Sequence, residues 1–396
     1  MDWLWSLSLT DGVAQAVFLA CGAAGVVLAA RGRRRWWAAG ASLLAVGGAW
    51  LLLEAWWRPF PDRVDWRIYA AAAGVLFSLA CLALQRRGAV LASVALSAVA
   101  GLGAVNVVFQ EYPTVRAFDP QPVAVSMSYA DFSAREQAPR LGDREVGALV
   151  AVDLPGSGFS PRQAVAYVPP AYWRGERLPV MVLMPGNPGS PDQWFSSADA
   201  ARTADAYQAR HHGVSPIVVS VDATGSLTGN PLCIDGPEQQ VMTYLTRDVP
   251  AGMRSRFRVL DDPSRWIIGG LSYGGTCALQ VVTSHPEAYG TFLDFSGQKE
   301  PTTGDHEDTV RRFFGGDEAA FAAHNPADLL ARADYSGLRG RFVAGERDAE
   351  AVEALGRLDE LARAAGMDTR MMTVPGGHSF QAWRVALAET FEWAAA

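Results

Sequence analysis

The sequence predicts an α/β domain with a mostly parallel sheet, preceded by an all-α transmembrane region of four helices. Four apolar stretches, each about 20 residues long, fill the first 110 residues, and that is the length needed to cross a hydrocarbon core. From residue 146 onward, short apolar runs alternate with helical patterns, as in a parallel sheet covered on both faces. We therefore divide the 396 residues into a transmembrane region (1–110), a Pro-rich linker (111–145) and an α/β domain (146–396).

The apolar stretches of the first region run over 13–30, 36–57, 66–84 and 88–109. They should be helical, because backbone polar groups find no water inside a bilayer. Glycine and alanine are dense in all of them, which suits close helix packing, and tryptophans lie at several of their ends, where a lipid interface favours them. A cleaved signal peptide is the alternative for the first stretch. Three further stretches follow it, however, and no small-residue cleavage site is evident.

Arginine placement predicts the orientation in the plasma membrane. Arginines 31, 33, 34 and 35 lie between the first two stretches, and Arg86 and Arg87 lie between the last two. Positively charged loops stay in the cytoplasm. Four crossings then place both the N-terminus and the C-terminal domain on the outer face.

Composition excludes some partners. The net charge of −7 argues against nucleic acid, because phosphate binding needs a basic face. The chain has no H-E-x-x-H and no paired C-x-x-C, so we expect no metal. Its Gly-rich turns at 156–158 and 186–189 are too short for nucleotide loops, and we expect no cofactor. The lipid bilayer is the expected partner of the first region, and the sequence does not identify protein partners.

In the α/β domain, each expected element has a clear apolar pattern, and the first two strands, joined by a short Pro-Gly turn, suggest an antiparallel start to the sheet. The linker before them holds four prolines and one short amphipathic piece (129–137). The expected strands are 146–153, 164–168, 180–184, 217–221, 266–269, 291–295, 341–344 and 371–374, and the expected helices are 192–210, 238–257, 274–284, 317–331, 349–365 and 380–395.

One of these strand-to-helix junctions carries a reactive serine motif. Gly270-Leu-Ser-Tyr-Gly274 fits G-x-S-x-G between an apolar strand and a helix. That setting is typical of a nucleophile elbow, in which glycines allow a strained serine and close neighbouring chains. Ser272 is therefore the candidate nucleophile, and a Gly-rich structural turn is the alternative.

A serine hydroxyl needs a base to react at neutral pH. Of the six histidines, His378 follows the last expected strand in Pro375-Gly-Gly-His-Ser-Phe380, where the chain order serine, acid, histidine places the base. The orienting acid should lie between the two. Asp348, in the loop after strand 341–344, is the candidate, with Glu346 as the alternative, while Asp294 is expected to be structural.

An oxyanion hole needs two aimed N–H groups. One should be the amide of Tyr273, directly after the serine. The other should come from the loop after strand 180–184. Pro188 has no N–H, so Asn187 is the candidate donor and Gly186 the alternative.

These motifs taken together resemble the esterase D family of α/β-hydrolases, which includes secreted mycolyltransferases and S-formylglutathione hydrolases. The resemblance covers about 146–396 and implies a triad of Ser272, Asp348 and His378, with oxyanion donors at Asn187 and Tyr273. Within the same motifs, the candidates for the substrate pocket are Asp192, Trp194 and Trp383. The motifs are Met184-Pro-Gly-Asn187, Asp192-Gln-Trp194, Gly270-Leu-Ser-Tyr-Gly-Gly275, Gly345-Glu-Arg-Asp348 and Gly377-His-Ser-Phe-Gln-Ala-Trp383.

We therefore predict a membrane-anchored, extracytoplasmic serine esterase that works through an acyl-enzyme. An amphiphilic or lipid ester of the cell envelope is the expected substrate, because a tethered site meets such esters at high effective concentration. The resembling family is divided between hydrolysis and acyl transfer, so an acyltransferase acting on an envelope acceptor is the first alternative. A non-catalytic binding module is the second, and the intact triad argues against it. A channel or transporter with an accessory domain is the third, and the scarcity of ionisable residues in the spans argues against that.

The cysteines give one further expectation. Cys21 and Cys81 lie inside apolar stretches, whereas Cys233 and Cys277 are the two cysteines of the α/β domain. An oxidising compartment favours pairing them, although spacing alone does not show that they meet. We expect a disulfide between Cys233 and Cys277, with two separate buried thiols as the alternative.

Overall fold

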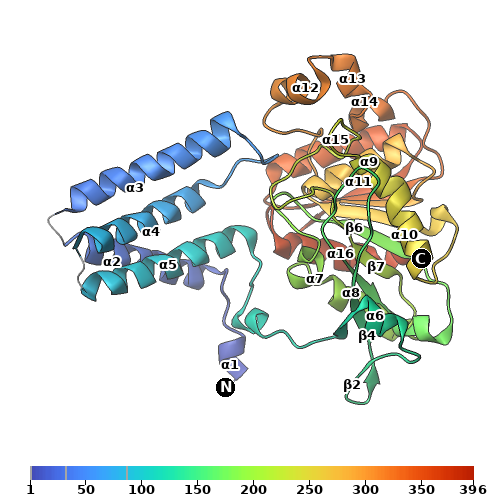
Figure 1. Cartoon of the computed structure of the whole chain (residues 1–396), viewed down its shortest axis with the longest axis horizontal. Helices are drawn as coiled ribbons and strands as arrows, with labels where there is room; N and C mark the ends of the chain where they lie inside the picture. The colour runs from blue at the N-terminus through green and yellow to red at the C-terminus, as the bar shows by residue number, and fades with distance from the viewer. Residues whose placement is uncertain (1, 32–33, 86–87) are drawn as a thin grey trace. The chain divides into compact units, whose positions relative to one another are not determined.

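The computed structural model describes residues 2–31, 34–85 and 88–396, and the chain divides into two compact units (Figure 1). The N-terminal unit holds Met1–Arg58 and Asp62–Pro120. The C-terminal unit holds Pro59–Pro61 and Gln121–Ala396.

In the described part of the N-terminal unit, four helices are long and apolar enough to cross a membrane. They begin and end within about two residues of the expected stretches. Arg33, Arg86 and Arg87, which carry part of the orientation argument, lie outside the described residues. The helices are α2 (Gly12–Ala29), α3 (Arg35–Trp50) with its π-helical continuation η1 (Leu51–Trp56), α4 (Trp66–Gln85) and α5 (Gly88–Phe109), with the short α1 (Asp2–Trp5) and η2 (Val115–Phe118) on either side.

Small side chains bring these helices together. A Cβ placed on Gly25 would lie 2.5 Å from Ser97 Oγ, so α2 and α5 approach as closely as glycine allows. The hydroxyls of Ser78 and Ser97 share a hydrogen bond of 2.8 Å. Ser42 Oγ donates to the Ala73 carbonyl at 2.8 Å, and this bond joins α3 to α4. In lipid, close backbone contact and interhelical hydrogen bonds of this kind hold helices together.

The C-terminal unit is built on a nine-stranded sheet of order β1-β4-β5-β7-β6-β8-β9-β10-β11. Strand β5 pairs antiparallel with both β4 and β7, and the remaining neighbours are parallel. The expected antiparallel start is therefore confirmed. The strands are β1 (Ala124–Ser128), β4 (Gly147–Val152), β5 (Ala164–Val168), β6 (Val180–Met184), β7 (Ile217–Ser220), β8 (Ile267–Leu271), β9 (Thr291–Phe295), β10 (Arg339–Gly345) and β11 (Asp368–Val374), and β2 (Arg140–Leu141) with β3 (Arg144–Glu145) forms a separate hairpin.

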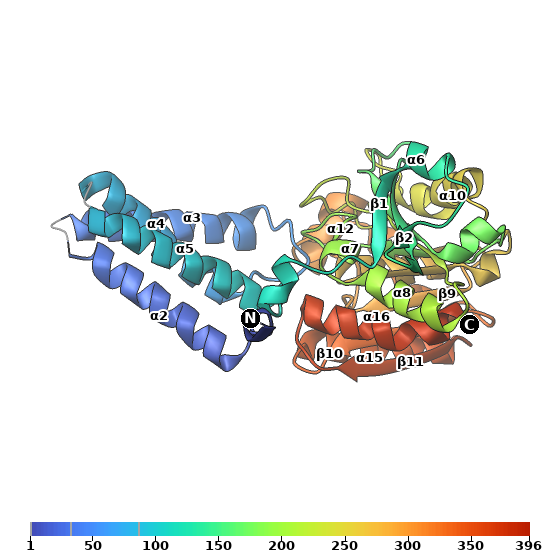
Figure 2. The same ribbon diagram turned by 90° about the horizontal axis from the view of Figure 1, so that it is seen from below.

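Helices cover both faces of the sheet. Successive strand residues point to opposite sides, so apolar side chains lie on both faces. Val182 of β6 belongs to a large apolar core under α10 (Val249–Arg256), α11 (Tyr273–Ser284) and α15 (Ala349–Ala364). The opposite face is covered by α8 (Ala200–Arg210) and α16 (Phe380–Ala395), which lie side by side in Figure 2. The central strands are buried on both sides and read as continuous apolar runs for that reason.

The region expected as a linker is partly structured. Strand β1 pairs in parallel with β4, with Ala124 opposite Gly147, and is followed by α6 (Tyr129–Ser133). The main stretch of the C-terminal unit thus begins at Gln121, not near residue 146. The sequence Ala-Val-Ser-Met-Ser is short and only half apolar, so its pairing at the sheet edge is decided by the partner strand.

Several expected helices are interrupted or differently placed. The helix expected over 192–210 is split into α7 (Gln193–Ser196) and α8, because Asp199 adopts a left-handed conformation with φ of 55°. The helix expected over 317–331 is split by Asn325-Pro326, which starts a new helix. The remaining helices are α9 (Val241–Thr243) with η4 (Tyr244–Asp248) ahead of α10, then α12 (His306–Phe314), α13 (Glu318–Ala322) and α14 (Pro326–Leu330), with the short turns η3 (Pro170–Arg174) and η5 (Pro263–Arg265).

Candidate active site

Ser272 occupies a strained turn between β8 and α11. Its φ of 52° and ψ of −121° lie outside the regions that side chains normally prefer, and such strain in a well-packed setting is typical of functional sites. A Cβ on Gly270 would lie 2.2 Å from the Gly274 carbonyl carbon, and one on Gly274 would lie 2.4 Å from the Met184 oxygen. Both positions therefore require glycine. Ser272 N donates to the Phe295 carbonyl at 2.7 Å, which ties the turn to the end of β9.

His378 and Asp348 meet at the same edge of the sheet. His378 follows the carboxyl end of β11, and Asp348 follows the carboxyl end of β10. In the sheet, β10 and β11 lie next to each other, and β9 lies between β10 and β8. His378 Nδ1 lies 2.8 Å from Asp348 Oδ2, and the Asp348 side chain is 9% exposed. Burial raises the pKa of this carboxyl, but the hydrogen bond from His378 and its charge outweigh burial, so the pKa lies below its ordinary value. A bond of this kind fixes the imidazole tautomer and leaves Nε2 as the ring atom that can act as base.

The alternative acids occupy other surroundings. Glu346 is exposed, two residues before Asp348. Asp294 is completely buried in β9, and its Oδ1 accepts from the Gly297 amide at 2.9 Å. Burial raises the pKa of Asp294 to about 7, against the opposing effect of that hydrogen bond. Asp294 therefore shapes the turn after β9.

Other histidines have partners away from Ser272. His211 pairs with Glu392 at 3.1 Å, and His285 lies 3.3 Å from Glu287. His306 lies between two glutamates on the insertion between β9 and β10. Among the residues that the structure describes, no group of three or more metal-ligating side chains could hold a metal ion.

The loop after β6 packs directly against the serine turn. A Cβ added to Gly186 would lie 3.5 Å from Ser272 Cβ, so this loop and the turn at Ser272 are in close contact. Asn187 is 7% exposed, and its Nδ2 donates to the Gly229 carbonyl at 3.0 Å. Tyr273 opens α11, so its amide is one of the first N–H groups of that helix, which have no intrahelical acceptor. The two expected oxyanion donors thus come from adjoining segments.

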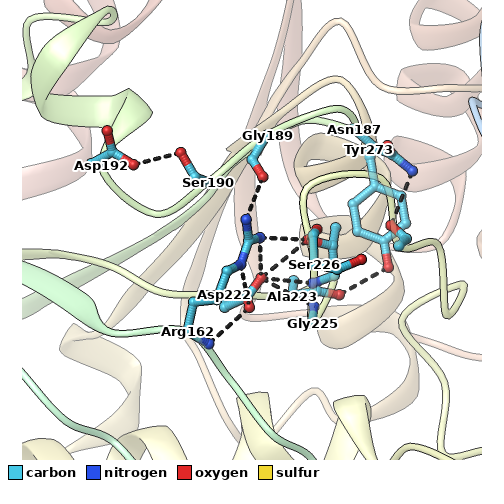
Figure 3. A network of polar contacts seen from close by, with 12 residues as sticks. Arg162, Asn187, Gly189, Ser190, Asp192, Asp222, Ala223, Gly225, Ser226 and Tyr273 are labelled. Atoms are coloured by element: carbon cyan, nitrogen blue, oxygen red, sulfur yellow. Dashed lines mark hydrogen bonds and ion pairs between the residues drawn. The ribbon is translucent and has the colours of Figure 1, made fainter.

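A partly buried ion pair, formed by Arg162 and Asp222, contacts the loop after β6 (Figure 3). Arg162 donates to both carboxylate oxygens of Asp222, at 2.7 and 2.9 Å, and to the Gly189 carbonyl at 2.7 Å. Asp222 has no exposed surface and also accepts from Thr224 and Gly225. Burial raises the pKa of Asp222, but the hydrogen bonds from Arg162 and Thr224 and the charge of Arg162 keep it below its ordinary value.

The segment that follows Asp222 links this ion pair to α11. Tyr273 Oη donates to the Ala223 carbonyl at 3.1 Å and accepts from the Cys233 amide at 3.2 Å. Cys233 and Cys277 are joined by a disulfide, with their Cα atoms 5.6 Å apart. The pairing expected from the sequence is therefore present, and it attaches the segment to α11.

The pocket candidates differ in their accessibility. Asp192 is exposed at the start of α7. Trp194 has no exposed surface, and its indole N–H donates to the Met184 carbonyl at 2.8 Å. In this conformation it supports the end of β6 and does not line a pocket, which corrects the expectation. Trp383 is 4% exposed and packs edge-on to His378, with 5.1 Å between ring centroids.

Two residues near the site were not anticipated from the sequence. Gln298 follows β9 by three residues, and its Nε2 lies 3.4 Å from Ser272 Oγ. Arg162 precedes β5, far from every motif in the chain. Gln298 carried one usable signal, since Ser296-Gly-Gln298 follows a central strand at the edge where Ser272 lies. Arg162 carried none, because its role depends on a partner 60 residues away.

Comparisons with known proteins show the family to which the chain belongs. The family named Esterase, described as "Putative esterase", matches residues 160–394. A Corynebacterium glutamicum protein, described as uncharacterized, is 53% identical over 411 aligned positions, which cover 98% of this chain and 96% of that one. The iron(III) enterobactin esterase of Dickeya dadantii is 23% identical over 227 positions, which cover 54% of this chain and 47% of that one.

Solved structures share the fold of the C-terminal unit. The S-formylglutathione hydrolase of Agrobacterium tumefaciens is 21% identical with a TM-score of 0.50, and the match covers 59% of this chain and 88% of that one. The fluorophosphonate-binding serine hydrolase F of Staphylococcus aureus is 15% identical with a TM-score of 0.52, covering 63% and 99%. With its four long apolar helices followed by an α/β-hydrolase domain, the chain belongs to the esterase family.

Proposed function

We propose that the protein is a membrane-anchored serine esterase in which Ser272 is the nucleophile, His378 the base and Asp348 the orienting acid. One observation carries the proposal. The bond of 2.8 Å between His378 and Asp348 lies at the sheet edge that holds the strained Ser272 turn. A carboxylate, an imidazole and a hydroxyl in that order form the arrangement that activates serine for acyl transfer.

The proposed chemistry has two halves. Ser272 Oγ attacks the ester carbonyl carbon while its proton moves to His378 Nε2, and the carbonyl electron pair moves onto oxygen. The C–O bond to the alcohol then breaks, and the alcohol leaves with the proton from His378. Water repeats the sequence on the acyl-enzyme and releases the acid and Ser272. Asp348 stabilises the imidazolium that forms in each half.

The backbone amides of Asn187 and Tyr273 are the proposed oxyanion donors. The close approach of the β6 loop to Ser272 supports this assignment. Donors held rigidly where charge develops supply a large share of such rate enhancements. Gly186 remains the alternative for the first donor.

We further propose that the substrate is an amphiphilic ester of the cell envelope and that the C-terminal unit faces outward. The four membrane-length helices support the anchoring. The disulfide between Cys233 and Cys277 supports an oxidising compartment. A reporter fused after Ala396 should be active outside the cytoplasm only, and one placed at 32–35 inside only. The reverse pattern would place the site in the cytoplasm.

Labelling with a fluorophosphonate probe tests the assignment of the nucleophile. The full-length protein in detergent should be labelled at Ser272, and the Ser272→Ala variant should lose label and nearly all turnover while keeping its melting temperature. His378→Ala should lose a similar amount, because the two residues act as a unit. A folded wild-type chain that resists the probe would favour the non-catalytic binding module.

Acyl transfer is distinguished from hydrolysis by the products. Ser272 is 5% exposed, and a site that admits little bulk water favours an alcohol acceptor where one is bound. Turnover of a short acyl ester with added alcohol should give free acid in an esterase and a new ester in an acyltransferase. The ratio of the two products assigns the reaction.

A further inference from the structure

We propose that Gln298 is a further catalytic residue, whose side-chain amide donates a hydrogen bond to the attacking oxygen of Ser272. The proposal rests on the function above, since it requires Ser272 to be the nucleophile. Gln298 Nε2 lies 3.4 Å from Ser272 Oγ. Gln298 is half-buried, whereas Ser272 is 5% exposed, so the contact lies within the packed edge of the sheet.

Thr276 determines which end of the Gln298 amide faces the serine. The Thr276 hydroxyl accepts from the Gln298 backbone amide at 2.8 Å. Its own proton is then directed to Gln298 Oε1, which lies 2.6 Å away. Because Oε1 is engaged by this donor, the NH₂ group is the end that faces Ser272 Oγ. Thr276 lies one helical turn after Ser272, so nucleophile and orienting residue are carried on the same rigid helix.

The turn that presents Gln298 is itself tightly held. Ser296 adopts φ of 54°, and its amide donates to the Val343 carbonyl at 2.8 Å. The Gly297 amide donates to the buried Asp294 at 2.9 Å, and a Cβ on Gly297 would lie 2.3 Å from that carboxylate. The position of Gln298 is therefore determined by buried backbone contacts, as expected for a side chain that must act at a defined point.

The direction of the hydrogen bond from Gln298 to Ser272 affects the first chemical step. When Ser272 Oγ accepts from Gln298, its single proton remains to be donated, and His378 is the proposed acceptor. In the attack, the Oγ–carbon bond forms and that proton moves to His378 Nε2. Gln298 thus favours the rotamer in which the hydroxyl proton points to the base. It contributes no proton and gains none.

The size of the effect follows from the contact. A neutral hydrogen bond contributes about 0.5–1.5 kcal/mol, and its loss should raise the activation free energy of labelling by that amount. We therefore expect Gln298→Ala to lower the second-order rate of fluorophosphonate labelling by about two- to twelvefold. Thr276→Val should give a similar loss, and the double variant should lose little more than either single one, because both remove the same contact. Thr283→Val is the matched control on the same helix, where the hydroxyl bonds the Leu279 carbonyl and no site residue.

The Gln298→Glu variant tests whether Gln298 acts as a hydrogen-bond donor or only fills space beside Ser272. Glutamate has the same shape as glutamine, but as a carboxylate it only accepts hydrogen bonds, so it would draw the Ser272 proton away from His378. We expect this variant, with its melting temperature measured in parallel, to react more slowly than Gln298→Ala. A packing role predicts the opposite order, with glutamate milder than alanine.

The outcomes are distinguishable. If the wild-type chain is labelled and Gln298→Ala is labelled at the same rate, the role of Gln298 is overturned and the proposed function stays intact. The same conclusion follows if Gln298→Glu is labelled faster than Gln298→Ala. A wild-type chain that is folded and unlabelled overturns both. Loss of labelling in Thr283→Val as large as in Thr276→Val would show that helix stability, and not the contact, controls the rate.

Discussion

The His378 imidazole and the Asp348 carboxylate, 30 residues apart in the chain, are joined by a hydrogen bond of 2.8 Å. Parallel pairing of β10 with β11 brings their loops together, with Gly345 opposite Val374. The loops are then tied by backbone bonds, because the Arg347 amide donates to the Gly376 carbonyl at 2.9 Å. The pair is thus a product of strand register.

Asp348→Asn should lower kcat by roughly 10²–10⁴-fold, because asparagine stabilises the wrong imidazole tautomer while keeping the shape of the site. Glu346→Gln is the matched control and should change kcat less than about twofold, since its side chain is exposed. The rates are measured with a chromogenic short-chain ester. Full activity in the first variant with loss in the second would reassign the acid to Glu346.

Arg162→Lys should lower kcat about tenfold or more with little change in KM. Lysine keeps a positive charge beside the buried Asp222 but cannot bond this carboxylate and the Gly189 carbonyl in the fixed fork that Arg162 uses. A displaced β6 loop weakens transition-state binding more than substrate binding. Arg177→Lys, in an exposed ion pair with Asp261, is the control. Equal proportional changes in kcat and KM would contradict a positioning role.

Removing the disulfide should destabilise the C-terminal unit. The bridge joins residues 44 positions apart, and the chain-entropy relation assigns a closed loop of this length about 4 kcal/mol. The Cys233→Ser/Cys277→Ser variant should therefore unfold at lower denaturant concentration than the oxidised wild type. Reductant should shift the wild type in the same direction and leave the variant unchanged. Identical midpoints with and without reductant would show that the bridge contributes nothing.

Asp294 should make stability fall as pH rises from about 4 to about 7. Burial raises its folded pKa from 3.8 to about 7, so in this range the folded chain holds a proton that the unfolded chain has released. The contribution is complete below pH 4 and lost near pH 7, and it amounts to at most about 4 kcal/mol. Asp294→Asn keeps an acceptor for the Gly297 amide and should flatten this decline in urea titrations at each pH. A decline of unchanged size in the variant would assign it to other groups.

Local patterns in the sequence were sufficient to predict much of the C-terminal unit. The strand pattern around Ser272 predicted an elbow, because G-x-S-x-G between an apolar run and a helix has few other solutions. Seven of the eight expected strands, from 146–153 to 341–344, differ from the structure by no more than two residues at either end, and the eighth, 371–374, begins three residues earlier in the structure. Central strands buried on both faces must be apolar throughout, and this requirement appears in the sequence as continuous apolar runs.

Other features depended on partners distant in the chain. Strand β1 has a weak pattern of its own and exists because β4 offers an edge. Trp194 looked like a pocket residue, yet its indole reaches the end of β6 and is buried there.

The sequence by itself determined the division into four long apolar helices and an α/β domain, and it identified Ser272, Asp348 and His378 as candidates. Only the tertiary structure decided that Asp348, and not Glu346, bonds His378. It also decided that Arg162 bonds the loop after β6 and that Gln298 contacts Ser272. Periodicity and motif spacing report the local burial of each segment. Hydrogen bonds between side chains far apart in the chain depend on register and loop path, which no local pattern encodes.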